Sequence, residues 1–79
     1  MTAPDTAPSA AITITVTING EPREVPAALD VTGLLKHLQV EVRAVAVERN
    51  RRVVRRVDHN KTSIEAGDVI EIVSFVGGG

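Results

Sequence analysis

An alternating apolar segment near the start of the chain most constrains what this sequence can fold into. Residues 12–18 alternate isoleucine or valine with threonine without a break, and all seven are β-branched. A period of two in β-branched residues predicts a half-buried strand. Its four apolar residues are predicted to face the core: Ile12, Ile14, Val16 and Ile18.

A hairpin is predicted directly after this segment. Asn19 and Gly20 form a dipeptide that strongly favours a two-residue hairpin turn. Residues 21–25 should therefore return as a second strand. Because Pro22 has no amide hydrogen to donate to a neighbouring strand, this second strand is predicted to lie at an edge of the sheet or to be paired on one side near Pro22.

A short amphipathic helix is predicted over residues 31–39, after a connector at 26–29. Asp30 is a good N-cap for this helix. Gly33 is expected to weaken it by about 1 kcal/mol relative to alanine. Four apolar residues recur at helical spacing and form one stripe: Val31, Leu34, Leu35 and Leu38. A helix this short needs a sheet beneath it to be stable.

Three more extended segments follow the helix. Residues 44–49 predict a third strand with Val45 and Val47 facing inward, and residues 51–54 a short fourth strand after a turn at Asn50. Residues 55–63 are polar and are expected to be irregular, and residues 64–68 predict a turn with one apolar anchor, Ile64. The last strand, 69–73, is predicted to bury two side chains and to expose three. Ile70 and Ile72 form the buried set, and Val69, Glu71 and Val73 the exposed set.

The order of these elements predicts one α+β domain. A single helix can bury its stripe only by covering one face of one sheet. The hairpin, the helix, two strands and a final strand match the β-grasp arrangement, with a mixed sheet of four or five strands. Residues 1–11 are rich in Ala, Pro, Ser and Thr, a composition that buries too little surface to order itself, so they are predicted to be a disordered leader outside the domain at 12–79.

Composition excludes several kinds of chemistry. The 79 residues contain no cysteine, which rules out disulfides, a catalytic thiol and a thiolate metal site. The two histidines, His37 and His59, have no second ligand at metal-binding spacing, and no glycine-rich loop precedes a helix. We therefore expect no metal, no cofactor and no catalysis by this chain alone. His37 lies on the polar side of the helix stripe and is expected to be solvated.

Hydropathy and charge along the chain predict the cellular compartment. No apolar run approaches the ~18 residues of a membrane span, and the start of the chain lacks the basic and apolar stretches of a secretory signal. A cytoplasmic protein without membrane contact is the expectation. The net charge of −1 gives no global attraction to nucleic acid.

The C-terminus carries the strongest functional signal. The last strand leads through Ser74, Phe75 and Val76 into Gly77, Gly78 and Gly79. Residues 74–79 span roughly 20 Å if extended, at about 3.3 Å per residue. Three residues without side chains can pass through a slot too narrow for any Cβ atom. These features predict that the carboxylate of Gly79 is the reacting group, with a frayed glycine tail as the alternative.

Two surfaces are candidates for partner binding. Val73, Phe75 and Val76 would place exposed apolar side chains beside the glycines, a feature that often marks a partner site. The alternative is that Phe75 folds back over the end of the sheet. Five arginines form the only concentrated charge cluster: Arg49, Arg51, Arg52, Arg55 and Arg56. This cluster is either a docking surface for an acidic partner, a weak nucleic-acid contact or an ordinary solvated edge, and the lack of aromatics for base stacking disfavours nucleic acid.

These pieces together resemble the ThiS family within the ubiquitin-like ThiS/MoaD group, from residue 12 to residue 79. The matching pieces are the opening strand with Asn19-Gly20-Glu21-Pro22, the helix at 31–38, Val45-Ala46-Val47-Glu48-Arg49-Asn50, Ala66-Gly67-Asp68 before the last strand, and Phe75-Val76-Gly77-Gly78-Gly79. The chain departs from the family pattern at residues 51–56, where a Gly-acidic turn and a proline are common, and in the extra leader at 1–11.

The resemblance implies a β-grasp sulfur carrier of thiamine thiazole biosynthesis. The carboxylate of Gly79 would be adenylated with ATP by an E1-like, ThiF-like adenylyltransferase. Sulfur from a donor protein would replace AMP to give a thiocarboxylate, and a ThiG-like thiazole synthase would accept that sulfur. Gly77 and Gly78 would thread into both partners.

Other functions on the same scaffold stay open from the sequence. One is the small subunit of a molybdopterin synthase or a carrier for another sulfur acceptor. A second is a ubiquitin-like modifier joined to lysines, and a third is a β-grasp binding module with an idle tail.

Overall fold

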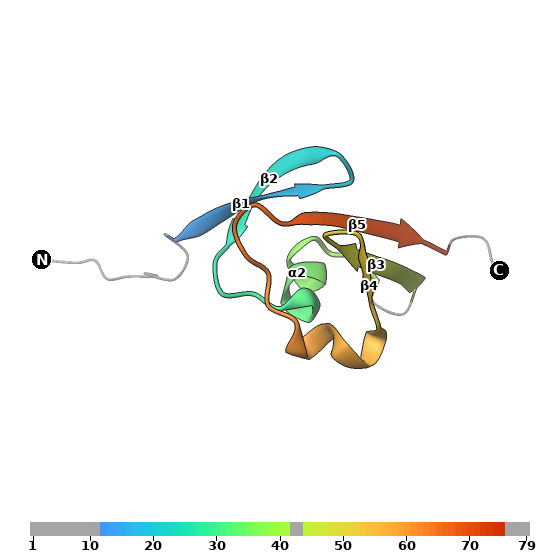
Figure 1. The fold of residues 1–79 in the computed structure, drawn as a ribbon. Coiled ribbons are helices and arrows are strands. Elements are labelled where there is room, and N and C mark those ends of the chain that lie inside the picture. The colour runs from blue at the N-terminus through green and yellow to red at the C-terminus, as the bar shows by residue number, and fades with distance from the viewer. Residues whose placement is uncertain (1–11, 42–43, 76–79) are drawn as a thin grey trace, which may run out of the picture.

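The computed structural model describes residues 12–41 and 44–75 (Figure 1). These residues form a mixed five-stranded sheet with helices on one side, which confirms the predicted α+β class. In chain order the elements are β1 (Thr13–Ile18), β2 (Glu21–Pro26), α2 (Val31–His37), β3 (Val45–Arg49), β4 (Arg52–Val54), the 3₁₀ helix η2 (Arg56–Lys61) and β5 (Val69–Ser74).

The last strand of the chain lies in the middle of the sheet. The strand order is β2-β1-β5-β3-β4, and β5 runs parallel to β1 and antiparallel to β3. β1 and β2 form the predicted hairpin, with Asn19 and Gly20 at φ values of 51° and 87° in the turn. β2 is an edge strand, as Pro22 predicts. Because β5 is hydrogen-bonded to a strand on each side, its position in the sheet is well fixed.

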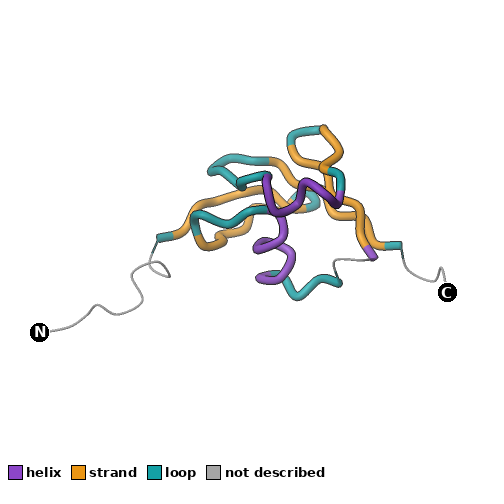
Figure 2. Tube along the Cα trace, turned by 90° about the horizontal axis from the view of Figure 1, so that it is seen from below, coloured by secondary structure: helices purple, strands orange, loops and turns teal. Residues whose placement is uncertain are grey.

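The helix α2 and the inward side of the sheet enclose the core (Figures 1 and 2). The Asp30 side chain accepts a hydrogen bond of 2.7 Å from the Gly33 amide and caps the helix as predicted. The apolar residues that are buried come from every strand except β4, from the helix and from the turn before β5. They are Val16, Ile18, Val25, Val31, Leu34, Leu35, Val45, Val47, Ile64 and Ile70. Leu38 and Ile72 are partly buried against this cluster.

The helix ends two residues earlier than predicted. Its last residue is His37, which is exposed as predicted, and Leu38 is the C-cap. Gln39 then takes a positive φ of 60°, a left-handed conformation that cannot continue the helix. The apolar spacing therefore located the buried stripe correctly, but it did not locate the end of the hydrogen-bonded turns.

Two predictions about burial and structure were wrong. Ile12 precedes β1 and its side chain is 60% exposed, because that end of the strand projects beyond α2 (Figure 1). Residues 56–61, expected to be irregular, form η2, and the side chain of His59 in this helix is buried. His59 Nε2 donates a hydrogen bond of 3.1 Å to the carbonyl of Val54, which ties η2 to β4.

No helix within the described ranges is long and apolar enough to cross a membrane.

Candidate functional site

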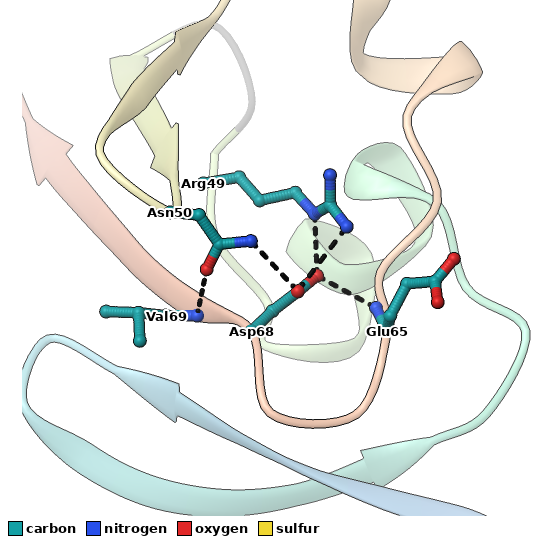
Figure 3. A network of polar contacts seen from close by, with 5 residues as sticks. All are labelled: Arg49, Asn50, Glu65, Asp68 and Val69. Carbon is teal, nitrogen blue, oxygen red and sulfur yellow. Dashed lines mark hydrogen bonds and ion pairs between the residues drawn. The ribbon is translucent and has the colours of Figure 1, made fainter.

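The strand that leads to the C-terminus is anchored at its start by the buried carboxylate of Asp68 (Figure 3). Asp68 Oδ2 accepts hydrogen bonds from Arg49 Nε at 2.6 Å and from the Glu65 amide at 2.8 Å. Asp68 Oδ1 accepts two more, from Asn50 Nδ2 at 3.1 Å and from Arg49 Nη2 at 3.4 Å. Burial alone would raise the pKa of Asp68, but these hydrogen bonds and the charge of Arg49 outweigh it and hold the pKa below its ordinary value of 3.8. Asp68 is therefore a carboxylate held charged beneath the turn that starts β5.

Two asparagine side chains bind β5 from opposite sides. Asn50 Oδ1 accepts a hydrogen bond of 2.9 Å from the Val69 amide, as Figure 3 shows. Asn19 Oδ1 accepts one of 2.8 Å from the Ile72 amide, and Asn19 Nδ2 donates one of 3.2 Å to the Ile72 carbonyl. Both asparagines have positive φ and lie in the turns that follow β1 and β3, the strands on either side of β5. We call Asn19 and Asn50 the asparagine clamp.

The far end of β5 stays paired up to the last described residue. Ser74 lies opposite Val45 in the ladder with β3, and the Phe75 amide donates a hydrogen bond of 2.7 Å to the carbonyl of Ala44. The segment that follows Phe75 in the sequence thus leaves from a strand held in the centre of the sheet. The position at which the chain leaves the sheet after Phe75 is therefore fixed by backbone pairing.

The exposed apolar residues predicted beside the tail are where the sequence placed them. The side chains of Val73 and Phe75 are 56% and 58% exposed, so Phe75 does not fold back over the end of the sheet. Val69 is exposed on the same side of β5 as Val73, because positions two apart in a strand share a face. The exposed side of β5 thus carries three apolar residues, Val69, Val73 and Phe75, with the exposed Glu71 between Val69 and Val73. We call these three apolar residues the apolar face.

The remaining predicted site residues are Val76, Gly77, Gly78 and Gly79, and they lie outside the described residues. Within residues 12–41 and 44–75, no three His, Asp or Glu side chains are grouped so that they could hold a metal ion.

Reasoning from the sequence missed the side chains that hold β5. Asn19, Asn50 and Asp68 were recognised only as turn residues, which they are. Their contacts join residues that lie 18 to 53 positions apart in the chain. A hydrophobic period or a local motif carries no information on such contacts. The one usable signal is that Asn19 and Asn50 each directly follow a predicted strand, so their side chains could reach a strand that lies between the two.

Comparison with known proteins agrees with this architecture. The model of the ThiS family matches residues 16–79, which includes the glycine end. The crystal structure of the thiamine biosynthesis protein ThiS from Geobacter metallireducens superposes with a TM-score of 0.74 at 38% identity, covering 84% of this chain and 100% of that one. This similarity confirms the β-grasp fold.

Two curated relatives of different length are also similar to this chain. The sulfur carrier protein ThiS of Bacillus subtilis is 44% identical over 46 residues, 58% of this chain and 70% of that protein. A thiazole synthase of Paramagnetospirillum magneticum is 45% identical over 62 residues, 78% of this chain but 19% of that protein. The chain thus spans about a fifth of the length of that synthase. With most of its length matched by one family model and by a solved member of full coverage, the chain belongs to the ThiS family.

Proposed function

We propose that this protein is the sulfur carrier of thiamine thiazole biosynthesis and that the carboxylate of Gly79 carries the sulfur. The observation that supports this most is that the family match runs to residue 79, through the three glycines that follow the central strand. The B. subtilis relative is named a sulfur carrier and the G. metallireducens relative a thiamine biosynthesis protein. These names favour thiamine over a molybdopterin synthase.

The proposed chemistry uses the protein as a substrate rather than as a catalyst. The carboxylate oxygen of Gly79 attacks the α-phosphorus of ATP, pyrophosphate leaves, and an acyl adenylate forms. Hydrosulfide, released at the sulfide oxidation level by a donor protein, then attacks the carbonyl carbon through its sulfur. AMP leaves with the bonding electron pair, the proton of the hydrosulfide passes to solvent, and a thiocarboxylate remains. An E1-like adenylyltransferase is the partner that binds ATP.

A thiazole synthase is the proposed acceptor of the sulfur. Support comes from the synthase of P. magneticum, in which a segment 45% identical to this chain belongs to a much longer protein. Joining the two in one chain raises the effective concentration of one for the other. Val73, Phe75 and Val76 are proposed to contact the partners, while Gly77 and Gly78 thread into their active sites.

Deleting Gly78 and Gly79 tests the role of the tail. Intact mass after incubation with ATP, the adenylyltransferase and the sulfur donor should show no thiocarboxylate on the shortened protein. The fold should survive, because glycine has no side chain that could form part of the core. A matched control that lacks residues 2–10, at the other end of the chain, should load normally. Loading of the protein without Gly78 and Gly79 would reject the proposal.

A further inference from the structure

Positive charge is concentrated in one short part of the chain. Residues 49–61 contain six of the nine Lys and Arg residues and one of the ten Asp and Glu residues. This segment therefore carries +5 at neutral pH and the rest of the chain −6, so the net charge of −1 hides a strong separation. The segment comprises the end of β3, the edge strand β4 and the 3₁₀ helix η2.

The same segment forms a groove. An open groove of about 370 Å³ lies between the β3–β4 hairpin and η2. Its lining residues are Arg49, Arg52, Val53, Val54, Asp58, Lys61 and Thr62. This volume is within the range of binding sites, about 300 to 1,000 Å³. The arginine cluster of the sequence is therefore not only a solvated edge, because two of its members line a hollow together with a lysine from another element.

The cations in this groove differ in what they already bind. Arg49 is committed to Asp68 through its Nε atom at 2.6 Å, so it forms a wall of the groove. Asp58 faces Arg55 at 3.5 Å in an exposed pair. Arg52 and Lys61 are exposed, and neither has an ion pair or side-chain hydrogen bond within the described part of the chain. Two unpaired cations, one from β4 and one from the end of η2, thus flank the groove.

We propose that this groove binds an extended acidic segment of a partner protein, with carboxylates placed against Arg52 and Lys61. β4 is the last strand in the sheet order, so no other described strand pairs with its outer edge, where an added strand could pair. Val53 is exposed on β4 and supplies apolar contact between the charges. This proposal does not depend on the sulfur-carrier role of Gly79.

The lining favours carboxylates over phosphates. Phosphate sites commonly use backbone amides of glycine-rich loops or helix N-termini, whereas no glycine lines this groove. The carboxylate of Asp58 in the lining opposes a dianion more than a single carboxylate. Nucleic acid is disfavoured, because the lining offers no aromatic side chain on which a base could stack.

The test is a titration of the full-length, ¹⁵N-labelled protein with a short blocked peptide of alternating Glu and Thr. Amide shifts should concentrate at Arg52, Val53, Val54, Lys61 and Thr62. The R52A/K61A variant should bind about five-fold more weakly, the size expected for two exposed ion pairs. Binding should weaken between about 0.01 M and about 0.15 M ionic strength, as the screening length falls from about 30 Å to about 8 Å.

Controls separate a specific groove from general charge attraction. The R23A/K36A variant removes two exposed cations from β2 and α2 and should bind the peptide within about two-fold of the wild type. The Gln and Thr analogue of the peptide should not bind. If R52A/K61A loses its fold, R52Q/K61Q replaces it, because glutamine keeps more of the side-chain length.

Several results would overturn the proposal. These are shifts spread evenly over the surface, equal losses in the two variants, equal binding of the Gln analogue, and displacement of the peptide by inorganic phosphate or a single-stranded oligonucleotide at equal concentration.

Discussion

At the scale of single residues, Asp68 holds the start of β5 in place. Four hydrogen bonds from three residues converge on its carboxylate, donated by Arg49, Asn50 and the amide of Glu65. A buried carboxylate with this many donors stabilises the fold only while it is charged. Its pKa in the folded state lies below the value in the unfolded chain, so its contribution is fully present above about pH 4 and is lost as the pH falls through the folded pKa.

Replacing Asp68 with Asn should therefore destabilise the protein in a pH-dependent way. Near neutral pH, D68N removes the charge that Arg49 faces in a partly buried site, and the melting temperature should fall. As the pH falls from about 4 through the lower folded pKa of Asp68, the wild type also becomes protonated at this position, so the difference between the two proteins should shrink. Thermal unfolding across this pH range is the measurement. A difference that stays constant with pH would contradict this role of Asp68.

At the scale of elements, the asparagine clamp holds β5 in register between β1 and β3. The paired residues of β1 and β5 are Thr17 with Val69 and Ile18 with Ile70, and the last backbone hydrogen bond on the side of the β1–β2 turn runs from the Asn19 amide to the Ile70 carbonyl. The Asn19 side chain extends this contact by two hydrogen bonds to Ile72. The Asn19 side chain thus continues the hydrogen bonding along β5 beyond the end of β1.

The N19G variant isolates the effect of the clamp. Glycine keeps the positive φ that the turn requires, so the change removes the two hydrogen bonds without backbone strain. The loss should be about 1 kcal/mol of stability. The Ile72 amide should exchange with solvent faster than in the wild type. The amide of Val47 in β3 serves as the control, and its protection from exchange should fall only as much as the global stability falls. Unchanged protection at Ile72 would show that the clamp does not hold β5.

Much of this element structure could be predicted from local patterns. The alternation at 12–18, the Asn-Gly turn and the capped helical stripe located β1, β2 and α2, since each pattern is complete within a few residues. Gly33 was expected only to weaken the helix. In the structure, a Cβ atom at this position would lie 3.0 Å from Leu29 Cδ2, so packing of Leu29 gives a second reason for glycine there.

The parts that could not be predicted depend on tertiary contacts. The 3₁₀ helix η2 has no apolar period, and it is held by one buried histidine that contacts the Val54 carbonyl. Burial of His59 and the hydrogen bonds at Asp68 follow only once β4, β5 and η2 are placed together. For the candidate site, the exposure of Val73 was predictable from the period of two. The sequence left open whether Phe75 is exposed or folds back over the sheet, and the roles of Gly77, Gly78 and Gly79 stay a proposal.

At the scale of the whole molecule, the packed sheet and helix carry two distinct surface features, the apolar face of β5 and the basic groove. The core stabilises the sheet and helix, β5 presents Val73 and Phe75 on its exposed side, and the groove lies between the β3–β4 hairpin and η2. Surfaces at different places on the body leave room for more than one partner contact.

The V73S/F75A variant tests the apolar face. Because both side chains are more than half exposed, stability should change by about 0.5 kcal/mol or less. Formation of the thiocarboxylate or its use by the thiazole synthase should slow about ten-fold or more, since apolar residues in the centre of an interface carry much of its binding energy. Rates from a single-turnover assay check this. Equal rates for the variant and the wild type would exclude these residues from partner binding.

The most direct measurement of the central claim is the intact mass of the purified protein after reaction with ATP, an adenylyltransferase and a sulfur donor. With ATP alone and the adenylyltransferase, the mass should rise by that of an adenylate. With the donor added, it should instead show the replacement of one oxygen by sulfur, and fragmentation should place that sulfur on Gly79. No change in mass, or a sulfur located at another residue, would contradict the claim that the terminal carboxylate is the carrier group.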